Sequence, residues 1–141
     1  MTNLCNKFAD TKSFEEIIEL SKKGDLNNID LRIADLTDEN IKTLPPELTL
    51  ANFGKLKENA SKDDIVIGLV NMVFEIIAMM VAFASINDDV KDVVLIGNIV
   101  SIPVVKDVLR KIEKTHGLSF IIPENAQYAV VIGAILKSCS D

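Results

Sequence analysis

The sequence predicts an α/β fold: a mixed β-sheet with helices on both faces. Two short apolar segments, residues 92–96 and 118–122, are each followed by a segment with helical periodicity, at 101–116 and 125–138. Strands that alternate with helices in this way form parallel or mixed sheets. The third observation is a nearly continuous apolar segment at 61–86, which is long enough for one core helix.

The N-terminal part of the chain predicts a helix, a strand and a loop. The sequence S-F-E-E is a capping box, in which Ser13 is the N-cap and Glu16 bonds back to the Ser13 amide. We expect Gly24 to end this helix. Apolar and polar residues alternate over 29–35, which indicates a half-buried strand. The segment 37–59 contains two prolines and a glycine among polar residues, so we expect a loop with one short helical turn at most.

The longest predicted element is an apolar helix over residues 61–86. Ser61 and Asp64 form a second capping signature at its start. The segment is long enough to span a bilayer, but Glu75 near its centre and acidic residues at both ends disfavour a membrane span. We therefore expect a helix buried in protein, with no membrane partner. Because the helix is apolar around most of its circumference, one of its neighbours is expected to be a second subunit.

Two strand–helix units complete the chain. We expect Ser101 to be the N-cap of the helix over 101–116 and Gly117 to end that helix. Asn125 is the expected N-cap of the helix over 125–138. Both units have the order expected of a parallel or mixed sheet.

Gly97-Asn98, directly after the strand over 92–96, is the candidate ligand-binding segment. Glycine has no Cβ, so a ligand can approach the backbone closely there, and Asn98 offers a side-chain amide. In open α/β sheets, ligands bind outside the carboxyl ends of the strands. Gly97 could equally make only a tight turn, and the residues alone leave both interpretations open. Glu124 is a further candidate contact, although an acidic residue there also favours the positive end of the last helix.

Composition and charge disfavour several function classes. With 21 acidic and 15 basic residues the formal net charge is −6, which disfavours nucleic acid as a partner. Cys5 and Cys139 lie in no C-x-x-C or Cys/His cluster, so we expect a reducing compartment and no metal site. The first residues lack the pattern of a signal peptide, and we expect a cytoplasmic protein. The length corresponds to one domain, residues 1–141.

The remaining charged residues predict a surface rather than a site. His116 precedes a glycine at a helix end, where a cation interacts favourably with the helix dipole. It has no Ser, Cys or Asp partner in a recognisable motif, and we expect no catalytic residue in this chain. Lys106, Arg110 and Lys114 repeat at helical spacing, which predicts a solvated helix face rather than a phosphate-binding site.

An ordered set of short motifs covers almost the whole chain. They are S-F-E-E-I at 13–17, K-G-D at 23–25, N-I-D-L at 28–31, L-P-P-E-L at 44–48, F-G-K-L at 53–56, V-V-L-I-G-N at 93–98 and P-E-N-A-Q-Y-A-V-V-I-G-A at 123–134. This set resembles the C-terminal part of the type II pantothenate kinases. These enzymes belong to the superfamily of acetate kinases, sugar kinases, heat-shock ATPases and actin.

The resemblance implies an actin-like ATPase (ribonuclease H-like) C-terminal lobe that binds ATP with Mg²⁺, with no N-terminal lobe in this chain. Gly97 and Asn98 would belong to the adenosine motif, and the connecting helix would start near Glu124. The implied function is the ATP-binding and dimerisation portion of an enzyme that phosphorylates pantothenate, the first step of coenzyme A synthesis. The implied partners are a second copy, through the helix over 61–86, and an N-terminal kinase lobe on the same or another chain.

Four residues depart from the family pattern: Ala34, Phe74, Ala126 and Gln127. The chain also lacks a D-x-G-x-T-like phosphate loop, so we expect it to be inactive without the N-terminal half. The departures support an alternative interpretation, a non-catalytic structural or regulatory interaction module with a degenerate kinase lobe.

Overall fold

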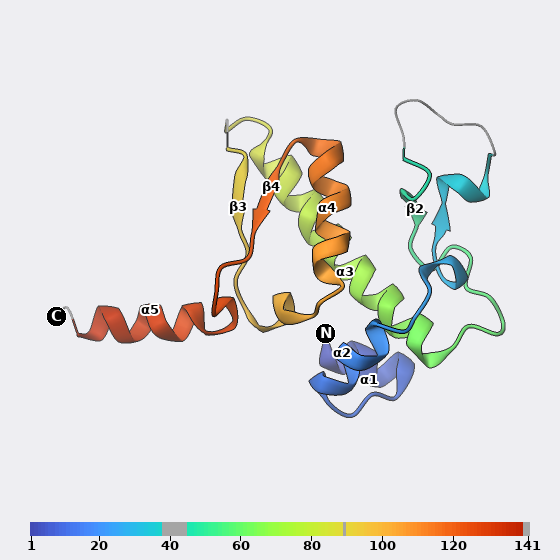
Figure 1. The fold of residues 1–141 in the computed structure, drawn as a ribbon, viewed down its shortest axis with the longest axis horizontal. Helices are drawn as coiled ribbons and strands as arrows, with labels where there is room; N and C mark the ends of the chain where they lie inside the picture. The colour runs from blue at the N-terminus through green and yellow to red at the C-terminus, as the bar shows by residue number, and fades with distance from the viewer. Residues whose placement is uncertain (38–44, 89, 140–141) are drawn as a thin grey trace. The chain divides into compact units, whose positions relative to one another are not determined.

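The computed structural model describes residues 1–37, 45–88 and 90–139 (Figure 1). The chain divides into two compact units, residues 1–73 and 74–141, which we call unit 1 and unit 2. Each unit contains helices and one two-stranded sheet, which confirms the α/β class. The described residues contain these two small sheets rather than one mixed sheet.

Unit 1 begins with two short helices and includes the first half of a long one. Its helices and strands are α1 (Thr2–Ala9), α2 (Phe14–Ser21), β1 (Leu31–Arg32), β2 (Thr49–Ala51) and α3 (Lys62–Ser85), which continues into unit 2. β1 and β2 are antiparallel. The unit encloses a small apolar core of Ile17, Ile29, Ile33, Val66, Leu69 and Val70.

Of the two hydrogen bonds predicted for the capping box of α2, the one to the Ser13 side chain is confirmed and the one to the Glu16 side chain has a different donor. The Ser13 hydroxyl accepts the Glu16 amide at 3.2 Å, but the Glu16 carboxylate accepts the Lys12 amide at 2.8 Å rather than that of Ser13. Gly24 does not end the helix, because α2 stops at Ser21. A Cβ on Gly24 would lie 2.2 Å from the Asp63 carbonyl oxygen, so this glycine permits close contact with the first turn of α3.

The strand predicted over 29–35 is much shorter than expected. Only Leu31–Arg32 is extended, and Ile33–Asp35 forms a 3₁₀ turn, η2. The Asp35 carboxylate accepts the Arg32 amide at 2.9 Å, and such a local side-chain bond favours a turn over a strand. The opposite error occurs downstream, where β2 lies within the predicted loop 37–59. Part of that loop, residues 38–44, lies outside the described residues.

The long helix has the bounds and the N-terminal cap that the sequence predicts. α3 begins at Lys62; the Ser61 hydroxyl accepts the Asp64 amide at 3.1 Å, and the Asp64 carboxylate accepts the Ser61 amide at 2.9 Å. The helix is long and apolar enough to cross a membrane by length and composition, and 44% of its most apolar window is buried. Buried core helices meet the same criterion. In unit 1 the helix carries a buried amide, Asn71, that donates to the buried Asp30 carboxylate at 2.9 Å, as a core helix does.

Unit 2 contains the two predicted strand–helix units. Its elements after α3 are β3 (Asp92–Val94), η3 (Asn98–Ser101), α4 (Val105–His116), β4 (Ser119–Ile121), η4 (Ala126–Tyr128) and α5 (Ala129–Ser138). β3 and β4 are parallel, with Val93 opposite Phe120, which confirms the predicted parallel pairing. Gly117 ends α4 in the left-handed conformation at φ 67°, as the sequence predicts.

Both helices of unit 2 start later than predicted. Ile102 is extended at ψ 119° because it precedes Pro103, and a residue before proline is disfavoured in the helical region. α4 therefore begins at Val105, and the Ser101 hydroxyl donates to the Asn98 carbonyl instead of capping it. Asn125 adopts a left-handed conformation and makes no capping bond, so α5 begins only after η4.

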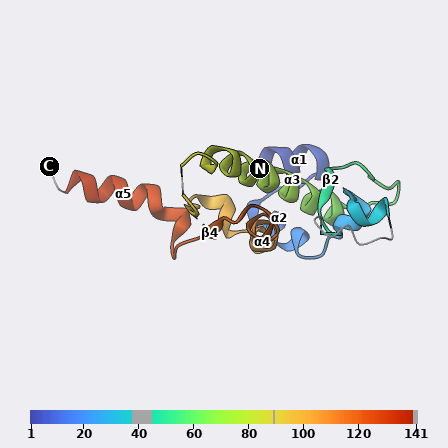
Figure 2. The ribbon, with the colours of Figure 1, turned by 90° about the horizontal axis from the view of Figure 1, so that it is seen from above.

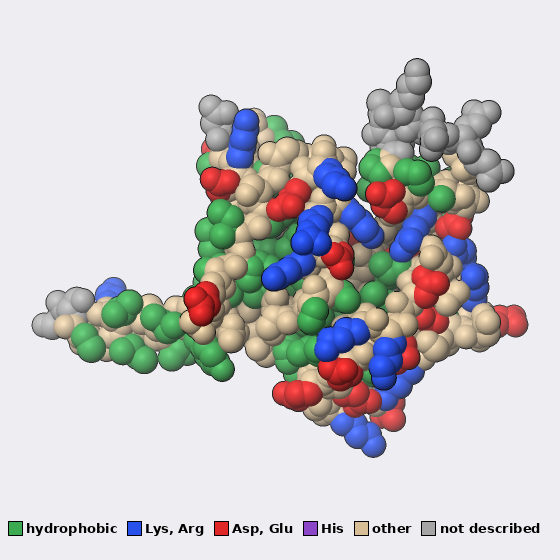
Figure 3. Space-filling model, in the orientation of Figure 1, with side chains coloured by type: hydrophobic (Ala, Val, Ile, Leu, Met, Phe, Trp, Pro, Cys, Tyr) green, Lys and Arg blue, Asp and Glu red, His purple; other side chains and the backbone are tan. Residues whose placement is uncertain are grey.

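The apolar surfaces of unit 2 are incompletely covered. α4 buries Val105, Val108, Leu109 and Ile112. On the other face of the strand pair, Val94 and Ile121 are 59% and 43% exposed, so helices do not cover both faces as expected. No residue of α5 is buried, although it is almost entirely apolar. Figures 1 and 2 show no other element of its unit beside α5, and Figure 3 shows hydrophobic side chains along its surface.

Asp64 connects three segments of unit 1. Besides capping α3, its carboxylate accepts the Asp25 amide at 2.7 Å and the Asn28 side-chain amide at 3.1 Å. Burial alone would raise the pKa of Asp64, but the hydrogen bonds from the Asp25 and Ser61 amides outweigh it, so the pKa lies below its usual value. The ionised carboxylate is therefore the form that the fold stabilises.

Asp64→Ala is expected to lower the free energy of unfolding by about 2–4 kcal/mol, because it removes a cap and leaves buried donors unpaired. Asp63→Ala is the matched control, since Asp63 lies in the same first turn and its side chain makes no hydrogen bond within the described residues. That control should cost less than about 0.5 kcal/mol. Urea unfolding followed by circular dichroism measures both, and equal losses would contradict the role given to Asp64.

Candidate functional site

The carboxyl ends of β3 and β4 lie side by side in unit 2. Because the strands are parallel, the segments that follow them leave the same edge of the sheet. Past the strands, the Leu95 amide donates to the Ile121 carbonyl at 2.9 Å, and the Gly97 amide donates to the Ala126 carbonyl at 2.9 Å. The structure thus brings together the two segments that the sequence singled out, one around Gly97 and one beginning at Glu124.

Gly97 adopts a backbone conformation that is readily accessible only to glycine. Its φ is 111°, a region that other residues rarely adopt, so the turn after β3 depends on this residue. A Cβ built at Gly97 would meet no atom within 4 Å, which means that the backbone there faces open space. Gly97 therefore makes a tight turn and also leaves room for a ligand, so the structure is compatible with both interpretations.

Asn98 is exposed directly after Gly97. Its backbone carbonyl accepts the Ser101 hydroxyl at 2.7 Å, which closes η3. Its side-chain amide makes no hydrogen bond within residues 1–37, 45–88 and 90–139. Asn98 thus has a donor and an acceptor available at the turn.

Glu124 lines a cavity of about 400 Å³ beside these turns. The cavity is formed by the end of η3, the start of α4 and the segment after β4, and its lining residues are Val100, Ser101, Ile102, Pro103, Lys106, Ile122, Pro123 and Glu124. Gly97 and Asn98 are not part of this lining, which begins two residues after Asn98 at Val100. Its volume is within the range of small-ligand pockets. The cavity combines an apolar wall with a carboxylate, an ammonium and a hydroxyl.

Sequence reasoning missed two residues of this cavity, Ser101 and Lys106. Ser101 was predicted as a helix cap, and Lys106 as part of a solvated helix face. The signal that could have placed them is Pro103, because it delays the helix and keeps residues 101–102 in the turn. Lys106 then lies in the first turn of α4, next to the cavity.

Two of the four departures from the family pattern, Ala126 and Phe74, have structural explanations in unit 2. The Ala126 side chain is 3% exposed, and its carbonyl accepts the Gly97 amide, so this residue helps to hold the two turns together. The Phe74 side chain is 1% exposed and fills part of the core. Nothing in the structure explains Gln127.

Neither His116 nor, among the described residues, a group of metal-ligating side chains lies at this site. His116 lines a different cavity at the other end of α4, with Ala82 and Leu118 among its neighbours. Within the described residues, no group of three His, Cys, Asp or Glu side chains could hold a metal ion. Two parallel strands with a cavity beyond their carboxyl ends define the general class, an α/β protein with its candidate site at the strand ends.

Comparison with known proteins identifies the particular family. Residues 1–112 match the model of the Fumble family, and the chain belongs to this family, which is that of the type II pantothenate kinases. It is 27% identical over 127 residues to a type II pantothenate kinase of Staphylococcus haemolyticus (strain JCSC1435), covering 86% of this chain and 48% of that protein. It is 26% identical over 141 residues to a type II pantothenate kinase of Oceanobacillus iheyensis, covering 98% of this chain and 54% of that protein. The chain thus spans about half the length of the curated relatives it matches.

Proposed function

We propose that this chain is the ATP-binding and dimerisation portion of a pantothenate kinase-like protein, with the architecture of an actin-like C-terminal lobe. In the complete assembly, an N-terminal kinase lobe on the same or another chain would bind pantothenate and transfer the γ-phosphoryl group of MgATP to it. The proposed setting is the cytoplasm. Membership of the Fumble family supports this proposal, as does similarity to type II pantothenate kinases over most of the chain.

The observation that carries the proposal is the junction of the two turns after β3 and β4. The Gly97–Ala126 hydrogen bond holds the turns together, and Glu124 lines the adjacent cavity. In α/β folds a nucleotide binds where the backbone of such a turn can approach it closely. Gly97 and Asn98 would contact the adenosine, with Glu124 at the edge of the site.

The residues of this site fit the adenosine part of MgATP better than its phosphates and metal. Gly97 faces open space and Asn98 has a free side-chain amide, which suits a base or ribose. ATP with Mg²⁺ would supply the phosphoryl group, and this chain's residues would bind and orient the nucleoside. In this proposal the ligands of Mg²⁺ and the catalytic base come from the N-terminal lobe.

A second candidate function is a non-catalytic structural or regulatory interaction module. The exposed apolar surface favours it: Val130, Val131 and Leu136 of α5 are 68%, 59% and 64% exposed, and one face of the strand pair is bare. Contiguous apolar surface of this kind marks a protein contact. Such a module would need the fold of unit 2 but not the free backbone at Gly97, so ATP binding separates the two functions.

Gly97→Val is expected to abolish or weaken MgATP binding at least about tenfold, because a branched side chain would occupy the space beside the turn and strain its backbone. Isothermal titration calorimetry measures the binding. The matched control is Gly117→Val, at the other end of α4, where φ is also positive and a Cβ would also meet no atom within 4 Å. Undiminished ATP binding by Gly97→Val, or no binding by the unsubstituted chain, would favour the interaction module.

The purified chain alone is expected to show no ATP-dependent phosphorylation of pantothenate, since phosphoryl transfer needs a positioned metal and an oriented base as well as a bound nucleotide. A coupled assay for ADP release, with and without pantothenate, measures the activity. The type II pantothenate kinase of Staphylococcus haemolyticus is the positive control. Pantothenate-dependent turnover by the isolated chain would contradict the proposed division of roles.

We also propose that the chain forms a homodimer through α3. Ile76, Met80 and Phe83 are spaced four and three residues apart, so they share one helix face, and they are 50%, 67% and 65% exposed. A twofold contact between two copies of this face would be self-complementary. A stable contact of this kind buries roughly 800 Å² per partner.

Light scattering at tens of micromolar is expected to give twice the monomer mass of 15.5 kDa. Met80→Glu should shift the mass toward the monomer, because a carboxylate would have to be buried without a partner. Leu36→Glu is the matched control, since Leu36 is also 67% exposed but lies in unit 1. A monomeric unsubstituted chain, or equal effects of the two substitutions, would contradict dimerisation through α3.

A further inference from the structure

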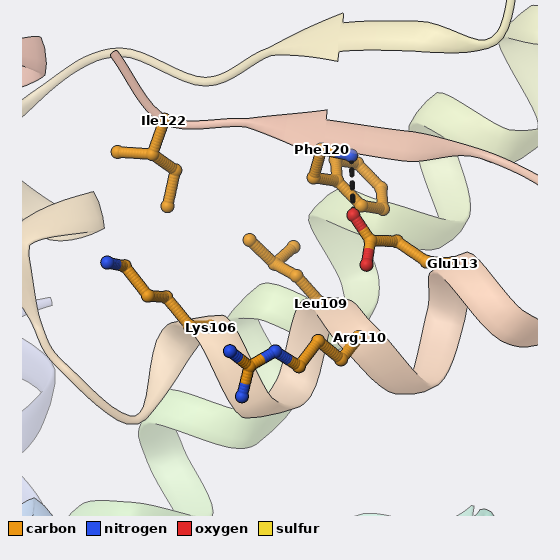
Figure 4. A pocket seen from close by; sticks show the side chains of 6 residues that line it. All are labelled: Lys106, Leu109, Arg110, Glu113, Phe120 and Ile122. Atoms are coloured by element: carbon orange, nitrogen blue, oxygen red, sulfur yellow. Dashed lines mark hydrogen bonds between the residues drawn. The ribbon is translucent and has the colours of Figure 1, made fainter. Parts of the chain in front are cut away.

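A further cavity in unit 2, of about 270 Å³, lies between α4 and β4. Figure 4 shows its lining: Lys106, Leu109, Arg110 and Glu113 from α4, Phe120 from β4, and Ile122 just after that strand. It shares Lys106 and Ile122 with the cavity that Glu124 lines. Nothing in the proposed nucleotide contacts uses Leu109, Arg110 or Phe120.

The two cations of this cavity have spare donors. Lys106 forms no hydrogen bond or ion pair within the described residues. Arg110 donates through Nη1 to the Asp107 carboxylate at 3.0 Å, and both side chains are about two-thirds exposed or more, at 67% and 71%. An exposed ion pair of this kind is weak, and a guanidinium has further N–H groups to offer. Figure 3 shows Lys and Arg side chains gathered over α4, although the chain as a whole is acidic.

The carboxylate of the cavity is already engaged. Glu113 Oε1 accepts the backbone amide of Phe120 at 2.7 Å, which fixes this side chain against β4. In Figure 4 the Lys106 and Arg110 side chains extend toward the start of α4, away from the position of Glu113. Positive charge is therefore concentrated at the end of the cavity near Lys106, and negative charge at the end near Glu113.

The floor of the cavity is apolar. Leu109 is 3% exposed, and Phe120 and Ile122 are half-buried beside it. An inorganic ion would leave this floor uncovered, whereas a ligand with an apolar or aromatic body would cover it and gain hydrophobic free energy. A volume of about 270 Å³ corresponds to a small molecule rather than a peptide.

We propose that this cavity is a binding site for a small organic anion, whose apolar or aromatic body lies on Leu109, Phe120 and Ile122 and whose phosphate or carboxylate group lies between Lys106 and Arg110. The inference does not depend on ATP binding at Gly97. It revises the expectation that Lys106 and Arg110 form only a solvated face, because the structure places them at the rim of a cavity with an apolar floor.

Phenyl phosphate is the probe, because it combines an aromatic body with a phosphate group. Titration of the isotope-labelled full chain, followed by amide NMR, is expected to give saturable shifts centred on Leu109, Arg110 and Phe120. Phenol and inorganic phosphate each lack one half of the ligand and should bind at least about tenfold more weakly. Benzoate is the second arm: tighter binding of phenyl phosphate assigns the site to phosphate esters, and tighter binding of benzoate assigns it to carboxylates.

Charge substitutions on α4 should act in opposite directions. Lys106→Gln and Arg110→Gln are each expected to weaken phenyl phosphate binding about threefold or more, as the loss of one charge near the anion would. Glu113→Gln keeps an oxygen for the Phe120 amide but removes the repelling charge, so it should tighten binding by a similar factor. Lys114→Gln is the matched control on the same helix, outside the cavity lining, and should change affinity less than twofold.

Gly97→Val separates this site from the proposed nucleotide site, since it should leave phenyl phosphate binding unchanged even where it abolishes ATP binding. The proposal would be overturned if the shifts centred elsewhere, if phenol bound as tightly as phenyl phosphate, or if Lys114→Gln weakened binding as much as Lys106→Gln. The amide spectra also report whether each variant, Gly97→Val included, keeps the fold. The four substituted side chains of α4 are exposed or partly exposed, so their replacement should disturb the fold little.

Discussion

The parallel pairing of β3 with β4 is the constraint on which the functional part of this molecule depends. Because the strands are parallel, the segments that follow β3 and β4 leave the sheet at the same edge, and the Gly97–Ala126 hydrogen bond holds their turns together. Gly97 satisfies this geometry through its positive φ. Because Pro103 keeps α4 from starting earlier, residues 100–103 are free of the helix and line a cavity. The pairing of β3 with β4 is also what places Glu124, which is far from Gly97 in sequence, beside the turn at Gly97.

Acidic residues in unit 1 serve the fold. Asp64 caps α3 and accepts bonds from Asp25 and Asn28, while the buried Asp30 carboxylate accepts the Phe53 amide at 2.9 Å and the Asn71 side chain. These two carboxylates join residues 25–30 and Phe53 to α3, so the N-I-D-L and F-G-K-L motifs are held against one helix. Packing and hydrogen bonding thus account for these acidic residues of unit 1.

The sequence predicts best where a local signal determines the structure. The apolar run and its cap place α3 within one residue of its observed ends, and Gly117 ends α4 as predicted. Predictions failed where a long-range contact or a competing local hydrogen bond determined the structure. The strand over 29–35 was shortened by the Asp35–Arg32 bond, β2 exists only as the partner of β1, and Gly24 is needed for contact with Asp63 rather than for ending α2.

The sequence singled out the residues of the turns at the candidate site but not the residues of α4 that line the cavities. Gly97 and Asn98 follow an apolar strand, which is a signal contained within a few residues, and Glu124 has the same relation to the next strand. Lys106 and Arg110 carry no such signal, because helical spacing alone describes a solvated face and a cavity rim equally well. What distinguishes them is the position of α4 against β4, which brings Phe120 and Ile122 opposite the helix.

The distribution of charge in unit 2 explains how one short helix can serve two neighbouring cavities. Asp107 and Glu113 are paired with Arg110 and with the Phe120 amide, so the acidic groups of α4 are directed at protein partners. Lys106, which stands where the two cavities meet, is left without one within the described residues. Removing the charge of Lys106 would therefore change the electrostatic potential in both cavities, whereas Arg110 lines only one of them. The MgATP and phenyl phosphate titrations of Lys106→Gln and Arg110→Gln distinguish a shared cation from two separate sites. If the cation is shared, Lys106→Gln should weaken the binding of both ligands, and Arg110→Gln should weaken only the binding of phenyl phosphate.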